Sequence, residues 1–275
     1  MKFYMLVLGL DTTTRQGSAA LVRDGVLLGT VSGDAMRAHG ERLPGDLIQL
    51  LNAHASRLAD VDLFAVASGP GSFTGLRIGI AALQGLALAN HRPLVGVSAL
   101  DALNHAARSS LTPLPSPLAG EVDQVAAWID AQRGQVFSSL YTRDKTLEGP
   151  AVEKPADLLA RWACRADLSA VAPDGAKAEA PQREGGLRLF VGDGALGYGS
   201  MIKDVFPDAH IMADVPPLAP TIARLAEAYM HQHGPMAPDA IRPLYIRRPD
   251  VELARDRAVR LKPDPTMKPD PTSAS

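Results

Sequence analysis

Short apolar runs separated by turn residues open the chain. The run Tyr4–Leu10 is apolar at nearly every position, as expected for a strand that is buried on both faces. The runs Ser18–Arg23 and Val26–Val31 flank Asp24-Gly25, which is a strong signal for a hairpin turn. We therefore predict that the protein begins with a three-stranded meander, with a turn at residues 11–17 between the first two strands.

The next part of the chain alternates between helical and strand patterns. Leucines at helical spacing predict an amphipathic helix over residues 41–58. The apolar run 63–67 predicts a buried strand, and the small-residue segment 74–90 predicts a second helix. A further strand is expected at 93–97, followed by a helix that ends near Arg108. This order of elements predicts an α/β fold.

A second unit follows a proline-rich connection. Residues 109–121 contain Pro113, Pro115 and Pro117 and are predicted to link two domains. Beyond this linker, apolar runs predict a hairpin, a helix and a strand, at 125–141, 155–164 and 187–191.

The last part of the chain contains one predicted helix and a repetitive tail. The helix begins at Pro220, and we expect it to return to the first domain. Residues 165–186 receive no element. The tail 249–275 repeats Lys-Pro-Asp-Pro-Thr twice, and its alternating prolines cannot form a helix or a central strand. We predict that this tail is disordered.

The stretch Gly69–Gly79 is a turn from a strand into a helix. Its glycines do not have the G-x-G-x-x-G spacing of a dinucleotide site, and Gly75 is followed by Leu76-Arg77 where a P-loop needs lysine. One alternative is a tight turn that starts a packed helix. The other is a smooth helical side that another helix, from the same chain or from a partner, can approach closely, because it carries Gly75, Gly79, Ala82 and Ala89.

Four segments follow one another in a specific order: Leu8–Thr13, Gly69–Gly79, Ile129–Phe137 and Pro243–Arg247. Together they resemble the bacterial TsaB (YeaZ) family, the non-catalytic subunit of the machinery that makes tRNA threonylcarbamoyladenosine. The resemblance implies the α/β fold of the actin-like ATPase (ASKHA) superfamily, with two ribonuclease-H-like subdomains whose mixed sheets are flanked by helices.

The resemblance also implies where the subdomains lie. Residues 1–108 and 219–248 are expected to form the first, partner-binding subdomain. Residues 122–218 are expected to form a second, reduced subdomain. The linker 109–121 and the tail 249–275 lie outside both.

The implied function is that of a scaffold subunit. The helices at 41–58 and 74–90 would bind the catalytic subunit, TsaD, and thereby support threonylcarbamoyl transfer to N6 of the adenosine beside the tRNA anticodon. An ATPase subunit, TsaE, would join the complex, tRNA would be held only through the complex, and the same helices would form a homodimer when the partner is missing. The implied partner contacts are Leu47, Leu51, His54, Ser72, Phe73, Thr74, Gly75, Arg77, Gly79 and Ala82.

Other residues resemble the nucleotide site of actin-like ATPases in a degenerate form. Asp11 and Asp130 stand where phosphate turns carry aspartate, but Thr12, Thr13 and Ala131 follow where glycine is expected. Gly192 and Gly194 resemble the loop on the adenosine side. We expect no cofactor and no ATP binding by the isolated chain. The alternative is an ATP-binding or ATP-hydrolysing enzyme of the sugar-kinase type. Asp11 and Asp130 would otherwise cap their own turns.

The net charge, the histidines and the single cysteine restrict which classes of protein fit the sequence. The net charge is −2, from 28 basic and 30 acidic residues, so no basic excess points to a chain that grips nucleic acid by itself. The histidines include no pair at the i, i+4 spacing of a helical metal site, and we predict no metal. Cys164 is the single cysteine, which excludes an intrachain disulfide. Asp11 follows the first apolar run where a signal peptide would need a cleavage site, and no run approaches a membrane span, so we expect a cytoplasmic protein.

Overall fold

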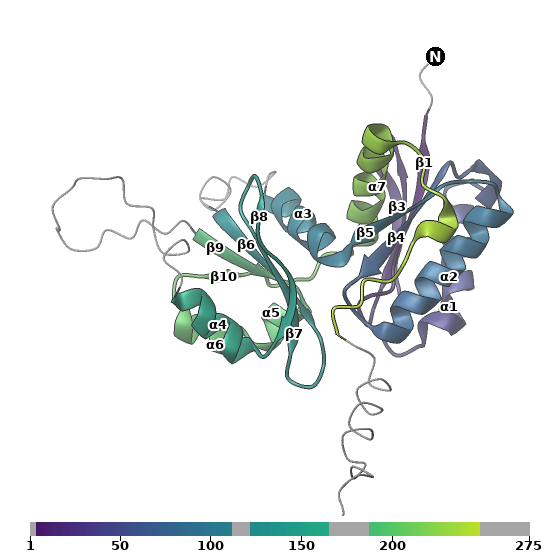
Figure 1. The fold of residues 1–275 in the computed structure, drawn as a ribbon. Coiled ribbons are helices and arrows are strands. Elements are labelled where there is room, and N and C mark those ends of the chain that lie inside the picture. The colour runs from purple at the N-terminus through teal and green to yellow at the C-terminus, as the bar shows by residue number, and fades with distance from the viewer. Residues whose placement is uncertain (1–3, 112–121, 165–186, 248–275) are drawn as a thin grey trace, which may run out of the picture.

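A computed structural model describes residues 4–111, 122–164 and 187–247 of the chain. Within these ranges the backbone forms two five-stranded mixed sheets, each with helices on both faces (Figure 1). Most of the predicted linker, residues 165–186 and the predicted disordered tail lie outside the described residues.

The first sheet contains the predicted meander. Its strand order is β3-β2-β1-β4-β5, in which β1, β2 and β3 are antiparallel and β4 and β5 run parallel to β1. Asp24 and Gly25, with φ values of 49° and 75°, form the predicted hairpin turn. The strands are β1 (Leu6–Asp11), β2 (Ser18–Arg23), β3 (Val26–Ser32), β4 (Leu63–Gly69) and β5 (Leu94–Ser98).

Helices cover both faces of this sheet. On one face α1 (His39–Ala53) packs on β2 and β3, and α2 (Phe73–Ala89) packs on β4. On the other face α7 (Ala219–His233) packs on β1, β2 and β4, so the predicted return of a late helix to the first subdomain is confirmed. The predicted extension of the first helix to residue 58 is wrong. The helix stops because Ala55 takes a left-handed φ of 48°, and a separate 3₁₀ turn, η1 (Leu58–Asp60), follows.

The second sheet repeats the topology of the first. Its order is β8-β7-β6-β9-β10, again with three antiparallel strands followed by two parallel ones. The strands are β6 (Val122–Asp130), β7 (Val136–Tyr141), β8 (Thr146–Glu153), β9 (Leu187–Val191) and β10 (His210–Ile211), and α4 (Pro155–Ala163), α5 (Asp193–Gly197) and α6 (Gly199–Val205) pack beside them. This repeat is the predicted ribonuclease-H-like duplication, and the predicted fold class is confirmed.

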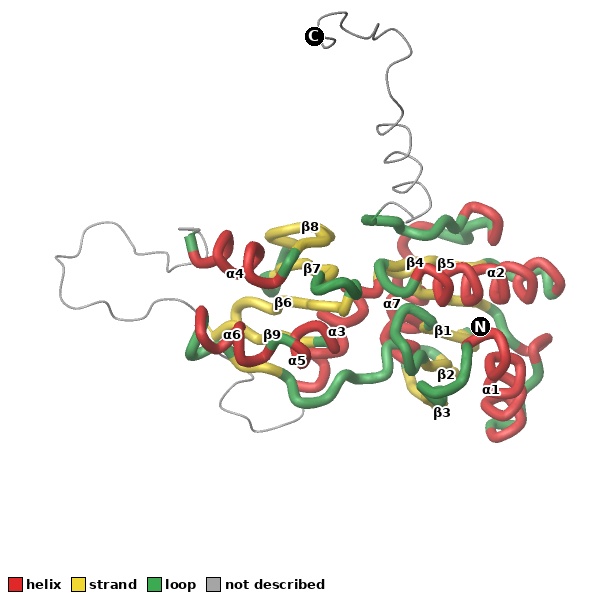
Figure 2. The backbone as a smooth tube through the Cα atoms, turned by 90° about the horizontal axis from the view of Figure 1, so that it is seen from below, coloured by secondary structure: helices red, strands yellow, loops and turns green. Residues whose placement is uncertain are grey.

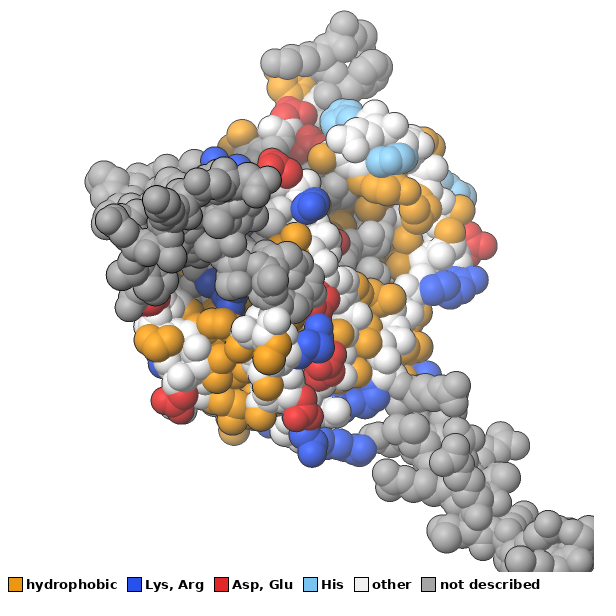
Figure 3. Space-filling view, turned by 60° about the vertical axis from the view of Figure 1, so that its left-hand side comes forward, with side chains coloured by type: hydrophobic (Ala, Val, Ile, Leu, Met, Phe, Trp, Pro, Cys, Tyr) orange, Lys and Arg blue, Asp and Glu red, His pale blue; other side chains and the backbone are white. Residues whose placement is uncertain are grey.

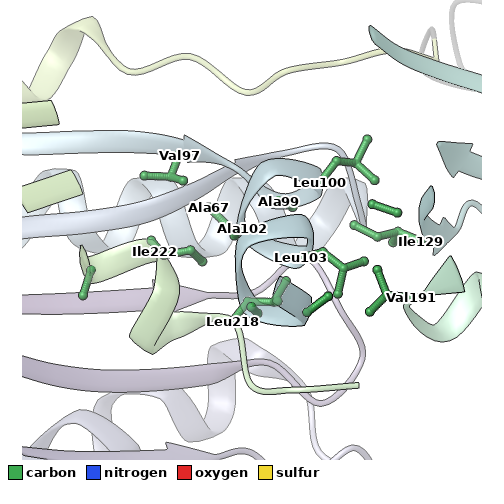
Figure 4. Packing of buried hydrophobic residues seen from close by; sticks show 14 of the residues in the cluster. Ala67, Val97, Ala99, Leu100, Ala102, Leu103, Ile129, Val191, Leu218 and Ile222 are labelled. Carbon is green, nitrogen blue, oxygen red and sulfur yellow. The ribbon is translucent and has the colours of Figure 1, made fainter. Parts of the chain in front are cut away.

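The elements stack in five layers. From right to left in Figure 1 these are α1 with α2, the first sheet, α7 with α3 (Ala99–Leu111), the second sheet, and α4 with α6. Figure 2 shows the same order of layers from below. Helix α3 runs three residues past its predicted end, into the predicted linker. It lies between the sheets, and its apolar side chains join one core with residues of both sheets (Figure 4). No helix in the described ranges is long and apolar enough to cross a membrane.

Candidate functional site: the cleft between the two subdomains

A cleft of about 1310 Å³ separates the two subdomains. One wall comes from the first subdomain: the turn after β1, the loop before α1 and the start of α2. The other wall is the turn between β6 and β7 together with Asp193, and the C-terminal segment Leu244–Arg247 closes one side. The cleft therefore brings two residues of the predicted degenerate nucleotide site, Thr13 and Asp130, next to the start of the predicted partner-binding helix, whereas Asp11, Thr12, Gly192 and Gly194 do not line it.

The glycines at the start of α2 accommodate a residue of the same chain. Ser72 caps the helix, because the Gly75 N–H donates to its Oγ at 3.2 Å. A Cβ added at Gly75 would lie 2.0 Å from the Thr12 carbonyl oxygen, and one added at Gly79 would lie 2.2 Å from the Thr12 Oγ1. The segment that lies against these two glycines is the turn after β1 of the same chain, and not another helix. These glycines are therefore not available for a partner, and their assignment as partner contacts is corrected.

Asp11 serves its own turn. Its Oδ1 accepts hydrogen bonds from the Thr13 N–H at 2.8 Å and from the Thr13 hydroxyl at 2.5 Å, and its Oδ2 accepts from the Thr14 hydroxyl at 3.2 Å. The side chain is buried, and burial raises the pKa of this carboxyl above its ordinary value, although the same hydrogen bonds lower it in part. The carboxylate thus holds the turn between β1 and β2 rather than facing the cleft.

Asp130 also caps a turn. Its two oxygens accept from the Gln132 N–H at 2.9 Å and from the Gln132 side-chain amide at 2.6 Å. The Asp130 N–H in turn donates to Asp193 at 2.9 Å, and burial raises the pKa of the Asp193 carboxyl. Both aspartates singled out in the sequence therefore satisfy neighbouring donors, as the turn-capping alternative expects.

Gly192 and Gly194 pack against β6. Gly192 has a φ of 111°, and an added Cβ would lie 2.0 Å from the Trp128 carbonyl oxygen. At Gly194 an added Cβ would lie 3.1 Å from the Ile129 carbonyl carbon. Both glycines thus let the start of α5 lie directly on the second sheet, and this packing accounts for them without a nucleotide.

Most of the implied partner contacts on α1 point inwards. Leu47 and Leu51 are 6% and 5% exposed and lie in the core between α1 and the first sheet. The ring of His54, at the end of the helix, lies against Gly29 of β3. Because a buried side chain offers almost no area to a partner, the assignments of Leu47 and Leu51 are corrected, whereas His54 is half-buried and its assignment stays a prediction. On α2, Ala82 is half-buried, while Ser72, Phe73, Thr74 and Arg77 are exposed and line the cleft.

The structure adds residues that the sequence patterns did not single out. Tyr245, from the C-terminal segment, lies with its ring centroid 5.0 Å from that of Phe73, and the Arg77 guanidinium lies 4.0 Å from the Phe73 centroid. Arg77 Nε donates to the Tyr245 hydroxyl at 2.9 Å. We call Phe73, Arg77 and Tyr245 the aromatic cluster. Four further arginines line the same cleft: Arg15, Arg37, Arg133 and Arg247. Their wide separation in sequence gave no local signal.

The described ranges contain no candidate metal site. Among those residues, no group of three or more His, Cys, Asp or Glu side chains could hold an ion.

We expect the buried Asp11 carboxyl to make stability depend on pH. Its pKa in the folded chain lies above the ordinary 3.8, so between these values the folded chain binds more protons than the unfolded one and stability falls as pH rises. In Asp11→Asn no group titrates at this position, so the stability of this variant lacks this dependence on pH. The free energy of unfolding of Asp11→Asn, minus that of the wild type, should therefore increase from acid to neutral pH, by at most about 1.4 kcal/mol per pH unit.

Urea unfolding at a series of pH values measures this difference. The exposed turn cap Asp34, whose Oδ1 accepts from the Met36 N–H, provides the matched control Asp34→Asn. A difference for Asp11→Asn that shrinks towards neutral pH would contradict the argument.

Known proteins resemble the chain in sequence and in structure. The family model TsaD, tRNA N6-adenosine threonylcarbamoyltransferase, matches residues 24–258. The tRNA threonylcarbamoyladenosine biosynthesis protein TsaB of Escherichia coli is 35% identical over 144 residues, which are 51% of this chain and 57% of that protein. TsaB of Haemophilus influenzae is 33% identical over 141 residues, which are 51% of this chain and 56% of that protein.

A solved structure gives wider coverage. YeaZ from Pseudomonas aeruginosa superposes with a TM-score of 0.62 at 26% identity, over 88% of this chain and 99% of that chain. The sequence matches, by contrast, span little more than half the length of the curated relatives, 57% and 56%. With the family model matching residues 24–258, the chain belongs to the family described by the threonylcarbamoyltransferase model and, within it, to the TsaB (YeaZ) proteins.

Proposed function

We propose that the chain is a non-catalytic subunit in the synthesis of threonylcarbamoyladenosine in tRNA. It binds a TsaD-type catalytic subunit and supports the transfer of a threonylcarbamoyl group to N6 of the adenosine beside the anticodon. In this proposal an ATPase subunit, TsaE, joins the complex, and the chain works in the cytoplasm. The name of the Escherichia coli relative, a tRNA threonylcarbamoyladenosine biosynthesis protein, supports the pathway.

The exposed sides of α1 and α2 carry this proposal. Two large apolar side chains project from them, Ile48 at 59% exposed and Leu88 at 55%. Around them the surface is built from small residues, and a Cβ added at Gly45 or Gly85 would meet nothing within 4 Å. Exposed apolar side chains on a surface that another helix can approach closely are typical of an interaction site. We call Pro44, Gly45, Ile48, Ala81, Gly85 and Leu88 the helical face.

The hydrogen bonds that Asp11 and Asp130 accept support a non-catalytic role. Asp11 accepts three hydrogen bonds from its own turn, and Asp130 accepts two from Gln132. Asp11 does not line the cleft, and both oxygens of Asp130 already accept hydrogen bonds from its own turn. We therefore expect ATP with Mg²⁺ to leave the melting temperature of the isolated chain unchanged. A concentration-dependent rise in that temperature would favour the alternative of an ATP-using enzyme.

We expect Ile48→Asp combined with Leu88→Asp to abolish partner binding. Two buried charges at the centre of an interface cost at least as much as losing a hot-spot side chain, so affinity should fall about 30-fold or more. Titration calorimetry with the catalytic subunit of the same organism measures the affinity. Size-exclusion chromatography with light scattering reports both the heterodimer and any homodimer of the chain alone.

The matched control is Leu196→Asp, at an apolar side chain of the second subdomain that is 42% exposed. It changes charge in the same way outside the helical face and should leave the affinity unchanged. Unchanged binding by the double variant, or no complex with the wild-type chain, would contradict the proposed interface.

A further inference from the structure

The cleft concentrates positive charge that the chain as a whole lacks. The net charge of the protein is −2. On the face shown in Figure 3, acidic and basic side chains are interspersed. The first-subdomain wall of the cleft differs, because Arg15, Arg37 and Arg77 line it and no Asp or Glu is among its described lining residues. We call these three residues the arginine wall.

These arginines are not balanced by acids of the described chain. Arg15, Arg37, Arg77 and Arg247 form no ion pair with a carboxylate among the described residues. Arg247 instead donates to the Ala131 carbonyl oxygen at 2.7 Å and to the Gln135 side chain. Arginine presents a planar fork of donors that matches phosphate oxygens, so an uncompensated wall of arginines attracts a phosphate-bearing ligand.

The acidic groups of the cleft lie on the opposite wall. Asp130 and Asp193 belong to the second subdomain, and each accepts backbone N–H groups, Asp130 from Gln132 and Asp193 from Asp130 and Gly194. Arg133 lines this second wall as well, so of the two walls the one without acidic residues, on the first subdomain, is the more favourable for phosphates.

Aromatic rings stand beside the arginine wall. Phe73 and Tyr245 remain 36% and 38% exposed although they pack against each other and against Arg77. Exposed aromatic rings and guanidinium planes are the surfaces on which unpaired bases stack, and a positively charged groove beside such rings is typical of single-strand binding.

The cleft is larger than a mononucleotide needs. At about 1310 Å³ it exceeds the roughly 300–1,000 Å³ of sites for small molecules. We propose that this cleft binds a single-stranded segment of RNA, with phosphates on the arginine wall and bases stacked on the aromatic cluster. The choice of RNA rests on the proposed function, whereas the choice of a single strand rests on the cleft.

Fluorescence anisotropy of the full chain tests the proposal, with a labelled single-stranded RNA of about ten nucleotides. The affinity of the wild type should fall as salt rises. Arg15→Gln combined with Arg37→Gln should weaken binding about tenfold or more and reduce the slope of log affinity against log salt by about 1.4, since each lost phosphate contact removes about 0.7. Tyr245→Ala should weaken binding roughly tenfold and change the salt slope less than the double arginine variant does, because stacking carries no charge and Arg77, which donates to Tyr245, keeps its own charge.

The control is Arg23→Gln combined with Arg57→Gln, which removes the same charge from exposed arginines outside the cleft. An equal loss in the control, no binding of the RNA, displacement of the RNA by ATP with Mg²⁺, or tighter binding of DNA of the same sequence would each overturn the proposal. Thermal unfolding verifies that every variant is folded.

The inference about RNA and the proposed function can fail separately, because they are tested by different measurements. RNA binding is measured on the chain alone, and partner binding is measured with variants of the helical face. A chain that binds the catalytic subunit but not RNA keeps the proposed function and overturns the inference. A chain that binds RNA through the cleft but does not bind the catalytic subunit keeps the inference about the cleft and overturns the proposed role as a subunit.

Discussion

Gly75→Ala and Gly79→Ala are each expected to destabilise the chain by about 3 kcal/mol, the upper end for overpacking a core. A single methyl group has no space at either position. At Gly75 it would lie 2.0 Å from the Thr12 carbonyl oxygen, and at Gly79 it would lie 2.2 Å from the Thr12 Oγ1. Urea unfolding measures both losses. The matched control is Gly85→Ala in the same helix, where an added Cβ meets nothing within 4 Å and alanine should stabilise by about 0.5–1 kcal/mol.

A second substitution distinguishes the two clashes. The atoms that a Cβ at Gly79 would meet belong to the Thr12 side chain, so Thr12→Ala should recover part of the loss. The clash at Gly75 is with the Thr12 backbone, which no substitution removes. Thr12→Ala alone should cost about 1 kcal/mol, because the Thr12 hydroxyl donates to the Gly75 carbonyl oxygen at 2.8 Å. Additive losses for Thr12→Ala with Gly79→Ala would contradict this account.

The same contact changes how an interface should be tested. Gly79→Leu would be a natural probe of close helix approach by a partner. In the structure Gly79 faces Thr12 of its own chain, so the variant would lose the fold before it could report on a partner. Ile48 and Leu88 are the informative positions, because both are more than half exposed.

Leu103→Ala is expected to destabilise both subdomains together, by about 3 kcal/mol. Leu103 lies on α3, is 1% exposed and belongs to the core that joins the two sheets, where Ile129, Val191 and Leu218 are among its members (Figure 4). Removing its side chain leaves a cavity between the subdomains. Denaturant unfolding followed by two signals measures the effect: far-UV circular dichroism reports both sheets, and the fluorescence of Trp128 and Trp162 reports the second.

The two signals should shift together in Leu103→Ala. The matched control is Leu196→Ala, the same substitution at an exposed leucine, which should change stability by less than about 0.5 kcal/mol. If fluorescence and circular dichroism separate already in the wild type, the shared core does not couple the subdomains.

Elements with strong local signals could be predicted from the sequence. The opening meander followed from its apolar runs and Asp24-Gly25, and the first strand of the second sheet from its apolar run. The edge strand β8 was missed because Gly149 and Pro150 lie within it, and such residues argue against a strand unless it is at an edge. The end of α1 was missed because the left-handed Ala55 has no sequence signature.

The site was harder to predict for a different physical reason. Periodicity identifies the apolar side of a helix, but it does not say that this side faces the helix's own sheet. The resemblance assigned Leu47 and Leu51 to a partner, whereas they belong to the core under the helix. The cleft escaped prediction because its arginines come from separate turns and Tyr245 from the last described segment, and only the fold brings them together.

The C-terminal segment has a mechanical consequence. The Leu244 N–H donates to the Ser68 carbonyl oxygen of the first sheet at 2.7 Å, and three residues later Arg247 donates to Ala131 of the second subdomain at 2.7 Å. Four residues, 244–247, thus connect the first sheet to the second subdomain beside the cleft. A connection this short limits how far the two subdomains can move apart on this side, so an occupant of the cleft has to fit the width that the connection allows.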